Sequence, residues 1–163
     1  GHAEWHHRPV PRRSPRSAPR PDTVVPTLYV VRHAPAGSRS AWTGPDTERP
    51  LSPRGRREAA AIADLLAERG VTRLVSSPAV RCTQTFGPLG DKLGLAVEAE
   101  RRLQEGTGGP DVVALVAELC NDGRDRVALC SHGDVIPELL RASRRRAPAS
   151  PNRSPGPRRP PGS

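Results

Sequence analysis

The sequence predicts an α/β fold, a three-layer α/β/α sandwich with a mostly parallel central sheet. Two observations carry this prediction. Between residues 27 and 140, short apolar segments rich in β-branched residues alternate with longer segments of helical period. Polar side chains follow directly where three of these apolar segments end, in RHA, SSP and SHG. Strands that alternate with helices of this length are typical of a parallel sheet covered on both faces.

The first apolar segment, 27–31, is short, continuous and β-branched, which predicts a fully buried strand. A loop with a Gly-Pro turn signal follows. A helix is then predicted from Pro53 to a stop at Gly70, because Ser52 is a good N-cap and proline suits the first helical position. Glycine is the preferred residue just past a helix end. The residues of helical period in this segment are Ala59, Ile62, Leu65, Leu66 and Arg69.

The second half repeats the pattern. Residues 71–75 predict a strand, and Ser77-Pro78 is a second cap-then-proline pair that predicts a helix through 79–94. Residues 95–100 predict a short strand and 127–130 another apolar strand, with a last helix beginning near residue 135. Between them lies a helical segment with one apolar face, formed by Val112, Leu115, Val116 and Leu119.

Net charge divides the chain into three parts. The whole chain carries a formal charge of +9, but residues 1–26 and 141–163 hold 12 of the 26 basic residues, 12 of the 20 prolines and only two of the 17 acidic residues. Such segments cannot bury enough apolar surface to fold, so we predict two disordered Arg/Pro-rich tails around a nearly neutral domain at 27–140. Weak, salt-sensitive contact of these tails with nucleic acid or anionic lipid is the alternative interpretation.

Composition argues against several other classes. No apolar run approaches the length of a membrane span, and the amino-terminal segment has no hydrophobic core of a secretory signal, so we expect a cytoplasmic protein. The three cysteines have no CxxC spacing, which favours small buried thiols over a disulfide framework or a zinc site. Near the amino terminus, we interpret His2, His6 and His7 as part of a tag-like end, in preference to a metal site. We expect no cofactor.

Four residues are the candidate functional site. Ligands of parallel sheets bind outside the carboxyl ends of the strands. Arg32 and His33 follow the first strand, Arg81 lies in the helix after the second, and His132 follows the last. Taken singly, each is more often structural. Taken together at one sheet edge, they predict an anion pocket, because guanidinium groups match phosphate oxygens and disfavour a metal cation.

The same residues suggest a reaction. A histidine among arginines is disfavoured as a cation, so a neutral imidazole can attack phosphorus and form a phosphohistidine. The arginines and the second histidine would stabilise the equatorial oxygens. Glu105 precedes a Gly-rich loop and is the candidate general acid, with Glu100, Asp134, Asp46 and Glu48 as rivals. No GxxxxGK[ST] motif occurs.

The motifs VVRHA, PLSPRGRREA, SSPAVRCTQT and CSHGD, in this order, resemble the histidine phosphatase superfamily, which has the phosphoglycerate-mutase-like fold. The short form without a large cap is similar to the SixA branch. The stretch from Ala36 to Gly55 looks closer to the histidine phosphatase domain that some actinobacterial proteins carry behind a Nudix domain, of which no segment is present here. Many members have RHG where this chain has RHA. Members usually continue with a further strand where this chain has its Arg/Pro-rich tail, so we expect the domain to lack its last strand.

The resemblance implies a metal-independent phosphatase with His33 as phosphoacceptor, Arg32 and Arg81 on the phosphoryl oxygens, His132 completing the pocket and Glu105 near the place of the acid. Its substrate is a phosphorylated small molecule, a nucleotide or a phosphohistidine protein, with specificity residues from 38–49, including Ser38, and from 104–110. The alternatives are a non-catalytic domain that binds phosphorylated ligands or nucleic acid, and a phosphoglycerate-mutase-type phosphotransferase.

Overall fold

The computed structural model describes residues 26–121 and 126–146. Helices and strands alternate along the chain with two short 3-10 turns, η1 and η2. In order, the elements are β1 (Thr27–Arg32), η1 (Asp46–Glu48), α1 (Pro53–Glu68), β2 (Arg73–Ser76), α2 (Val80–Leu93), β3 (Val97–Ala99), η2 (Arg101–Leu103), α3 (Gly109–Asn121), β4 (Arg126–Ser131) and α4 (Ile136–Arg146).

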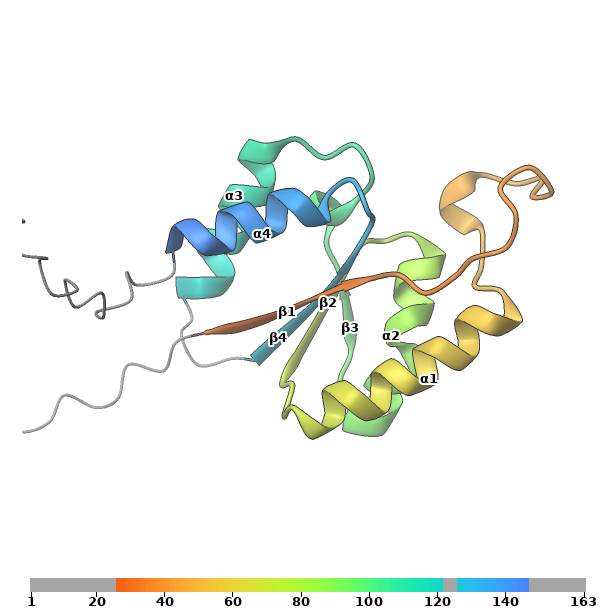
Figure 1. The fold of residues 1–163 in the computed structure, drawn as a ribbon, viewed down its shortest axis with the longest axis horizontal. Helices are drawn as coiled ribbons and strands as arrows, with labels where there is room; N and C mark the ends of the chain where they lie inside the picture. The colour runs from red at the N-terminus through yellow and green to blue at the C-terminus, as the bar shows by residue number, and fades with distance from the viewer. Residues whose placement is uncertain (1–25, 122–125, 147–163) are drawn as a thin grey trace, which may run out of the picture.

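The four strands form one parallel sheet in the order β1-β4-β2-β3. Helices α1 and α2 cover one face, and α3 and α4 cover the other (Figure 1). The predicted three-layer α/β/α sandwich is therefore confirmed. Because every strand runs the same way, the chain leaves each strand at the same edge of the sheet, and this edge carries the polar residues of the candidate site.

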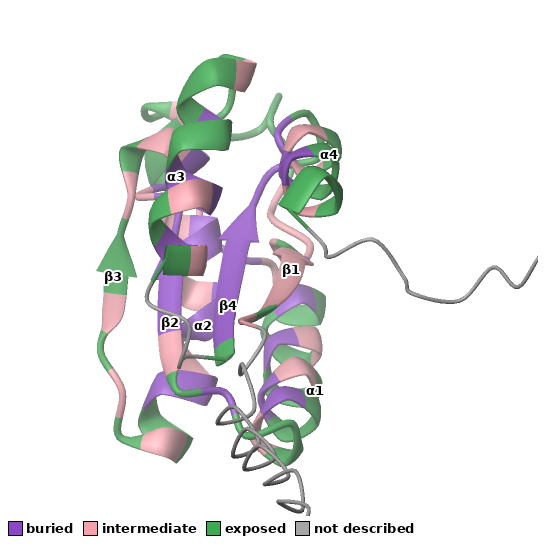
Figure 2. Cartoon of the chain, turned by 90° about the vertical axis from the view of Figure 1, so that its left-hand side faces the viewer, coloured by how far each residue is buried: buried purple, intermediate pink, exposed green. Residues whose placement is uncertain are grey.

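Two apolar cores lie on the two faces of the sheet. Along β4, Val127 and Leu129 belong to the core under α3 and α4, whereas Ala128 and Cys130 belong to the core under α1 and α2. This alternation is the two-residue period of a strand buried on both faces. Figure 2 shows β2 and β4 as the most buried strands.

The prediction of a fully buried first strand is wrong. The residues of β1 are half-buried or exposed, because β1 lies at an edge of the sheet with β4 as its neighbour. Its continuous apolar run is also what a central strand would show, so the sequence pattern does not separate the two positions.

The predicted boundaries of α1 are confirmed. Ser52 Oγ accepts a hydrogen bond from the Gly55 N–H, Pro53 is the first helical residue, and Gly70 has a left-handed φ of +70°. The buried face differs from the predicted one, since Leu65 and Arg69 are exposed, Ile62 is half-buried, and the smaller Ala63 packs inward. The strand predicted at 71–75 is β2, shifted toward the carboxyl end by one or two residues.

The prediction that Ser77 and Pro78 cap α2 is wrong. This helix begins at Val80, and its N-cap, Ala79, makes no side-chain hydrogen bond. Ser77 is instead buried and its hydroxyl is engaged by His132, as described below. Arg81 consequently lies in the first turn of α2, close to the sheet edge. The buried face predicted for α3 is confirmed in all four residues.

The last helix continues to Arg146, so six residues that we assigned to the carboxyl-terminal tail are helical. The rest of both predicted tails lies outside the described residues, as do His2, His6 and His7. Within 26–121 and 126–146, no helix has both the length and the apolar character needed to cross a membrane.

Candidate active site

The register of the sheet brings the two predicted histidines together. Arg32 is paired with Ser131 across β1 and β4, so the next residue on each strand, His33 and His132, leaves the sheet at the same level. The backbone N–H of His33 donates to the Ser131 carbonyl at 3.1 Å. The two imidazole rings lie edge to face, with centroids 5.4 Å apart.

The hydrogen bonding of His33 fixes its neutral tautomer. Its Nδ1 lies 2.8 Å from the Ala34 carbonyl oxygen, and a carbonyl only accepts, so Nδ1 carries the proton. In the neutral ring, Nε2 therefore has a free lone pair. Burial lowers the pKa of His33 below 6.5, with smaller contributions in the same direction from His132 and Arg81. The imidazole is thus neutral at pH 7, which is the form of a nucleophile.

The chain after His33 is held by hydrogen bonds to two helical segments. The Ala34 N–H donates to the Thr85 hydroxyl of α2 at 3.0 Å. The Pro35 carbonyl accepts from the N–H and the hydroxyl of Ser52, at 3.0 and 3.1 Å. No residue other than glycine has a positive φ in the described segments, so alanine fits after the histidine without strain, and its methyl group is buried.

Arg81 lies in the first turn of α2 and its side chain is only 2% exposed. Its Nη1 donates to the Asp46 carbonyl at 2.8 Å, and its Nη2 lies 3.2 Å from Asp46 Oδ2 and 3.3 Å from Glu105 Oε1. Its Nε has no partner within the described parts of the chain. A buried guanidinium aimed at the strand ends is a strong anion-binding group once an anion can reach it.

His132 is buried beside Arg81. Its Nε2 lies 2.9 Å from the Ser77 hydroxyl, and Ser77 Oγ also accepts from the Ala79 N–H at 3.3 Å. Its Nδ1 faces Arg81 Nη2 at 3.4 Å and Glu105 Oε1 at 3.6 Å. Ser77 thus sets the orientation of the ring so that Nδ1 is directed toward the charged cluster.

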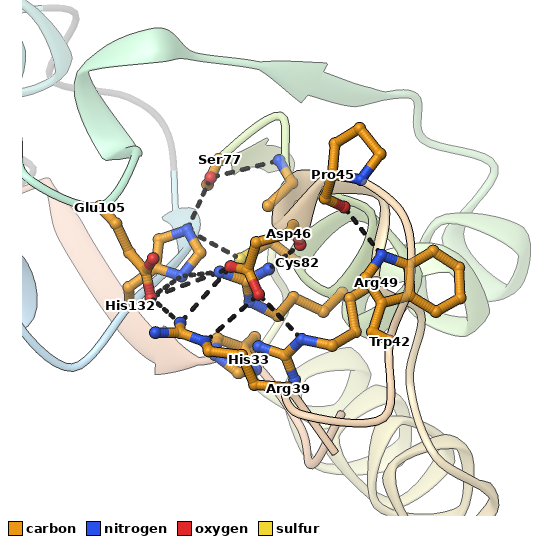
Figure 3. Close-up of polar contacts among 12 residues, drawn as sticks. His33, Arg39, Trp42, Pro45, Asp46, Arg49, Ser77, Cys82, Glu105 and His132 are labelled. Atoms are coloured by element: carbon orange, nitrogen blue, oxygen red, sulfur yellow. Dashed lines mark hydrogen bonds and ion pairs between the residues drawn. The ribbon is translucent and has the colours of Figure 1, made fainter. Parts of the chain in front are cut away.

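The loop that carries η1 contributes three charged side chains, all from the range 38–49 that we expected to supply specificity residues (Figure 3). Asp46 pairs with Arg39 through Oδ1 at 3.3 Å and with Arg49 through the same oxygen at 3.0 Å. Arg49 also donates to the Gly37 carbonyl at 2.6 Å. Partial desolvation would raise the pKa of Asp46, but the hydrogen bond from Arg49 and the charges of the nearby arginines lower it overall, so Asp46 is ionised.

A cleft of about 580 Å³ opens beside this cluster, and the buried Arg81 and His132 are not among the residues that line it. It is lined by Arg32, His33, Pro35, Ala36, Arg39, Arg49, Glu58 and Glu105. Arg32 is exposed in its wall, close to Gly133, and no carboxylate of the described residues pairs with it. Ser38 is not brought to the cleft: its hydroxyl is hydrogen-bonded to that of Ser40 on the exposed part of the loop.

The candidate general acids differ in whether their side chains reach the site. Glu105 and Asp46 reach the site, whereas Glu100 caps η2 and pairs with Arg102. Asp134 accepts from the Gly106 N–H at 2.8 Å and so holds the loop that carries Glu105. Glu48 is exposed.

The predicted buried thiols are Cys82 and Cys130, with Cys120 half-buried. Cys82 is more than a core residue, because its sulfur lies 3.6 Å from His132 Nε2. The sequence reasoning did not expect Ser77 and Thr85 in the site, and neither carries a spacing signal of its own. Arg39 and Arg49 lie in the expected range 38–49 but were not singled out within it.

The fold and the site define an α/β protein with two histidines and two arginines gathered at the carboxyl edge of its parallel sheet. The sequence model of the histidine phosphatase superfamily (branch 1) matches residues 28–111, which is half of the chain. The chain belongs to this superfamily, as its motifs predicted. The match includes Arg32, His33, Arg81 and Glu105, and it ends before His132.

Three relatives are informative. An 8-oxo-(d)GTP phosphatase of Mycolicibacterium smegmatis is 39% identical over 116 residues, which cover 70% of this chain and 36% of that protein. The chain therefore spans about a third of the curated relative. The protein histidine phosphatase SixA in complex with tungstate superposes with a TM-score of 0.61 at 27% identity, covering 69% of this chain and 73% of that one. A SixA-type protein from Nakamurella multipartitia gives 0.57 at 31% identity, covering 71% and 63%.

Proposed function

We propose that this chain is a phosphatase that transfers a phosphoryl group to Nε2 of His33 and then to water. The observation that carries the proposal is the state of His33: its Nδ1 donates its proton to the Ala34 carbonyl, burial and the nearby Arg81 lower its pKa, and it lines the cleft. A neutral imidazole with a free Nε2 lone pair next to a buried guanidinium suits attack on phosphorus.

In the first step, the Nε2 lone pair forms the N–P bond while the bond from phosphorus to the leaving oxygen breaks. Arg81, Arg32 and the Nδ1 side of His132 stabilise the charge on the equatorial oxygens. The leaving oxygen takes a proton from the protonated, carboxylic acid form of Glu105, which becomes a carboxylate in this step; its Oε1 lies 3.6 Å from His132 Nδ1.

In the second step, water attacks phosphorus and gives its proton to Glu105, and the N–P bond breaks to restore the Nε2 lone pair. The sum is hydrolysis of a phosphate monoester to an alcohol and phosphate. None of these steps is routed through a metal ion, and the guanidinium groups of the cleft oppose the binding of a cation.

Two substrate classes have support from relatives. The 8-oxo-(d)GTP phosphatase has the higher identity, which favours nucleotides, but the shared part is only 36% of that protein. The SixA structure is covered over 73% of its length and favours phosphohistidine on a protein. Because each class has the support of one relative, both belong in the first substrate panel, beside small phosphomonoesters.

The test is phosphate release from an aryl phosphate, with EDTA present, by the full chain and by His33→Ala. Turnover by the wild type, loss in the variant, and an acid-labile phosphoenzyme formed only by the wild type are expected. A His33→Ala protein that keeps the melting temperature of the wild type and still releases phosphate from the aryl phosphate would contradict the proposal. So would a folded wild-type chain that is silent on aryl phosphate, nucleotides and a phosphohistidine protein.

A further inference from the structure

Four side chains, those of Arg39, Asp46, Arg81 and Glu105, form a closed ring of alternating charge; Figure 3 shows Arg39, Asp46 and Glu105 turned toward one another. The Nη2 atom of Arg81 lies 3.2 Å from Asp46 Oδ2 and 3.3 Å from Glu105 Oε1. The Nη2 atom of Arg39 lies 3.4 Å from each of the same two oxygens. Two guanidinium groups therefore hold two carboxylate oxygens between them, as they would hold two oxygens of a tetrahedral anion.

The carboxylates of this ring occupy the guanidinium group of Arg81, which the proposed mechanism assigns to phosphoryl binding. Arg81 is buried, and the ring and the Asp46 carbonyl together engage both of its terminal nitrogens. An entering anion can bind Arg81 through Nη2 only after one of the carboxylates has moved aside. Arg32 differs, because it lies in the cleft wall without a carboxylate partner among the described residues.

The two carboxylates are not equivalent. Asp46 contacts Arg81 through Oδ2 and Arg49 through Oδ1, at 3.2 and 3.0 Å. A rotation about its side-chain bonds can release Oδ2 from Arg81 while Oδ1 keeps its hydrogen bond to Arg49. Asp46 is partly exposed, so the released oxygen is hydrated without a large desolvation cost. Glu105 has no second anchor of this kind among the described residues.

We propose that Asp46 is an internal competitor of the substrate: its carboxylate holds the place of a phosphoryl oxygen on Arg81 and is displaced when a phosphoryl group binds. Asp46 then determines which anions enter, because a dianionic phosphoryl group attracts the two guanidinium groups more strongly than a singly charged carboxylate does. Displacement also frees Arg39 to contact the bound anion. This inference rests on the assignment of Arg81 to phosphoryl binding in the proposed function.

The test is calorimetric titration of the full chain with tungstate, a tetrahedral dianion that needs no turnover. Asp46→Asn keeps the shape and removes the charge, and should bind tungstate about fivefold more tightly or better, since a partly buried ion pair with Arg81 no longer has to be broken. Asp46→Ser should gain similarly, whereas Asp46→Glu should bind as the wild type does. The matched control is Asp91→Asn, which removes the same charge from an exposed position in α2.

The expected result is tighter binding in Asp46→Asn and Asp46→Ser and no gain in Asp91→Asn. Equal or weaker binding in both Asp46 variants, with melting curves like that of the wild type, would overturn the inference and would mean that Asp46 only orders the loop. An equal gain in Asp91→Asn would also overturn it, since net charge would then explain the effect. Failure of the proposed function is distinguishable, because a chain that binds tungstate as described but hydrolyses no phosphate ester lacks the activity and still has the competitor.

Discussion

Replacing Thr85 by valine tests how the site is attached to the fold. Thr85 is buried in α2, and its hydroxyl accepts the Ala34 N–H at 3.0 Å and donates to the Arg81 carbonyl at 2.6 Å. Valine has the same branched shape without the hydroxyl. The Arg81 carbonyl lies within a helix and keeps a backbone donor, but the Ala34 N–H loses its acceptor in a buried place.

The size of the effect follows from that single lost acceptor. A buried donor left without a partner costs about 1–3 kcal/mol, and with little volume change there is no cavity contribution to add. We expect the free energy of unfolding of Thr85→Val to fall by that amount in urea. Because Ala34 follows the proposed nucleophile directly, a shift of this segment should also lower kcat/KM by about ten- to a hundredfold.

Thr85→Ser is the matched control, because it keeps the hydroxyl and loses only a methyl group. The reasoning requires the Thr85→Ser variant to retain most of the activity even if it is somewhat less stable. A Thr85→Val protein within about 0.5 kcal/mol of the wild type and with unchanged kcat/KM would refute it, since a buried unpaired N–H cannot cost so little.

Three further outcomes are expected. Burial lowers the pKa of His33, so the midpoint of the acid limb in the pH profile of kcat/KM should lie below pH 6.5, the ordinary pKa of histidine. A midpoint above pH 6.5 would contradict the neutral nucleophile. Gly55→Ala should lower the melting temperature and the activity together, because a Cβ there would meet the Pro35 carbonyl oxygen at 1.9 Å; a melting curve like that of the wild type would show that the loop after His33 can move away. Arg81→Lys should reduce kcat/KM by about tenfold or more, since an ammonium group cannot replace the two-pronged contact, and a smaller loss would place phosphoryl binding elsewhere.

Most of the architecture was predictable because each element carries its own local signal. The helix after the first loop begins where Ser52 and Pro53 indicate, and α3 buries the face that its apolar period indicates. The errors have a common cause. The edge position of β1 and the interior role of Ser77 depend on neighbours distant in sequence, which strand composition and capping patterns do not encode.

The chemistry-bearing residues were predictable for a different reason. His33 and His132 follow apolar strands, and a parallel sheet brings such positions to one edge, so topology alone makes them neighbours. Glu105 was a choice among several acids, and the structure brings it and Asp46 to Arg81. Ser38, chosen only by its place in the loop, lies outside the cleft.

By itself, the sequence determined the α/β class, the order of the elements and the residues that close each strand, because periodicity and capping act over a few residues. Only the tertiary structure decided which side chains meet across the cleft. Arg39, Asp46 and Glu105 come from two loops far apart in the sequence, and their ring with Arg81 exists because α2 and both loops converge on one sheet edge. Loop conformation is set by such distant contacts, since loops have no repeating pattern from which their paths could be predicted.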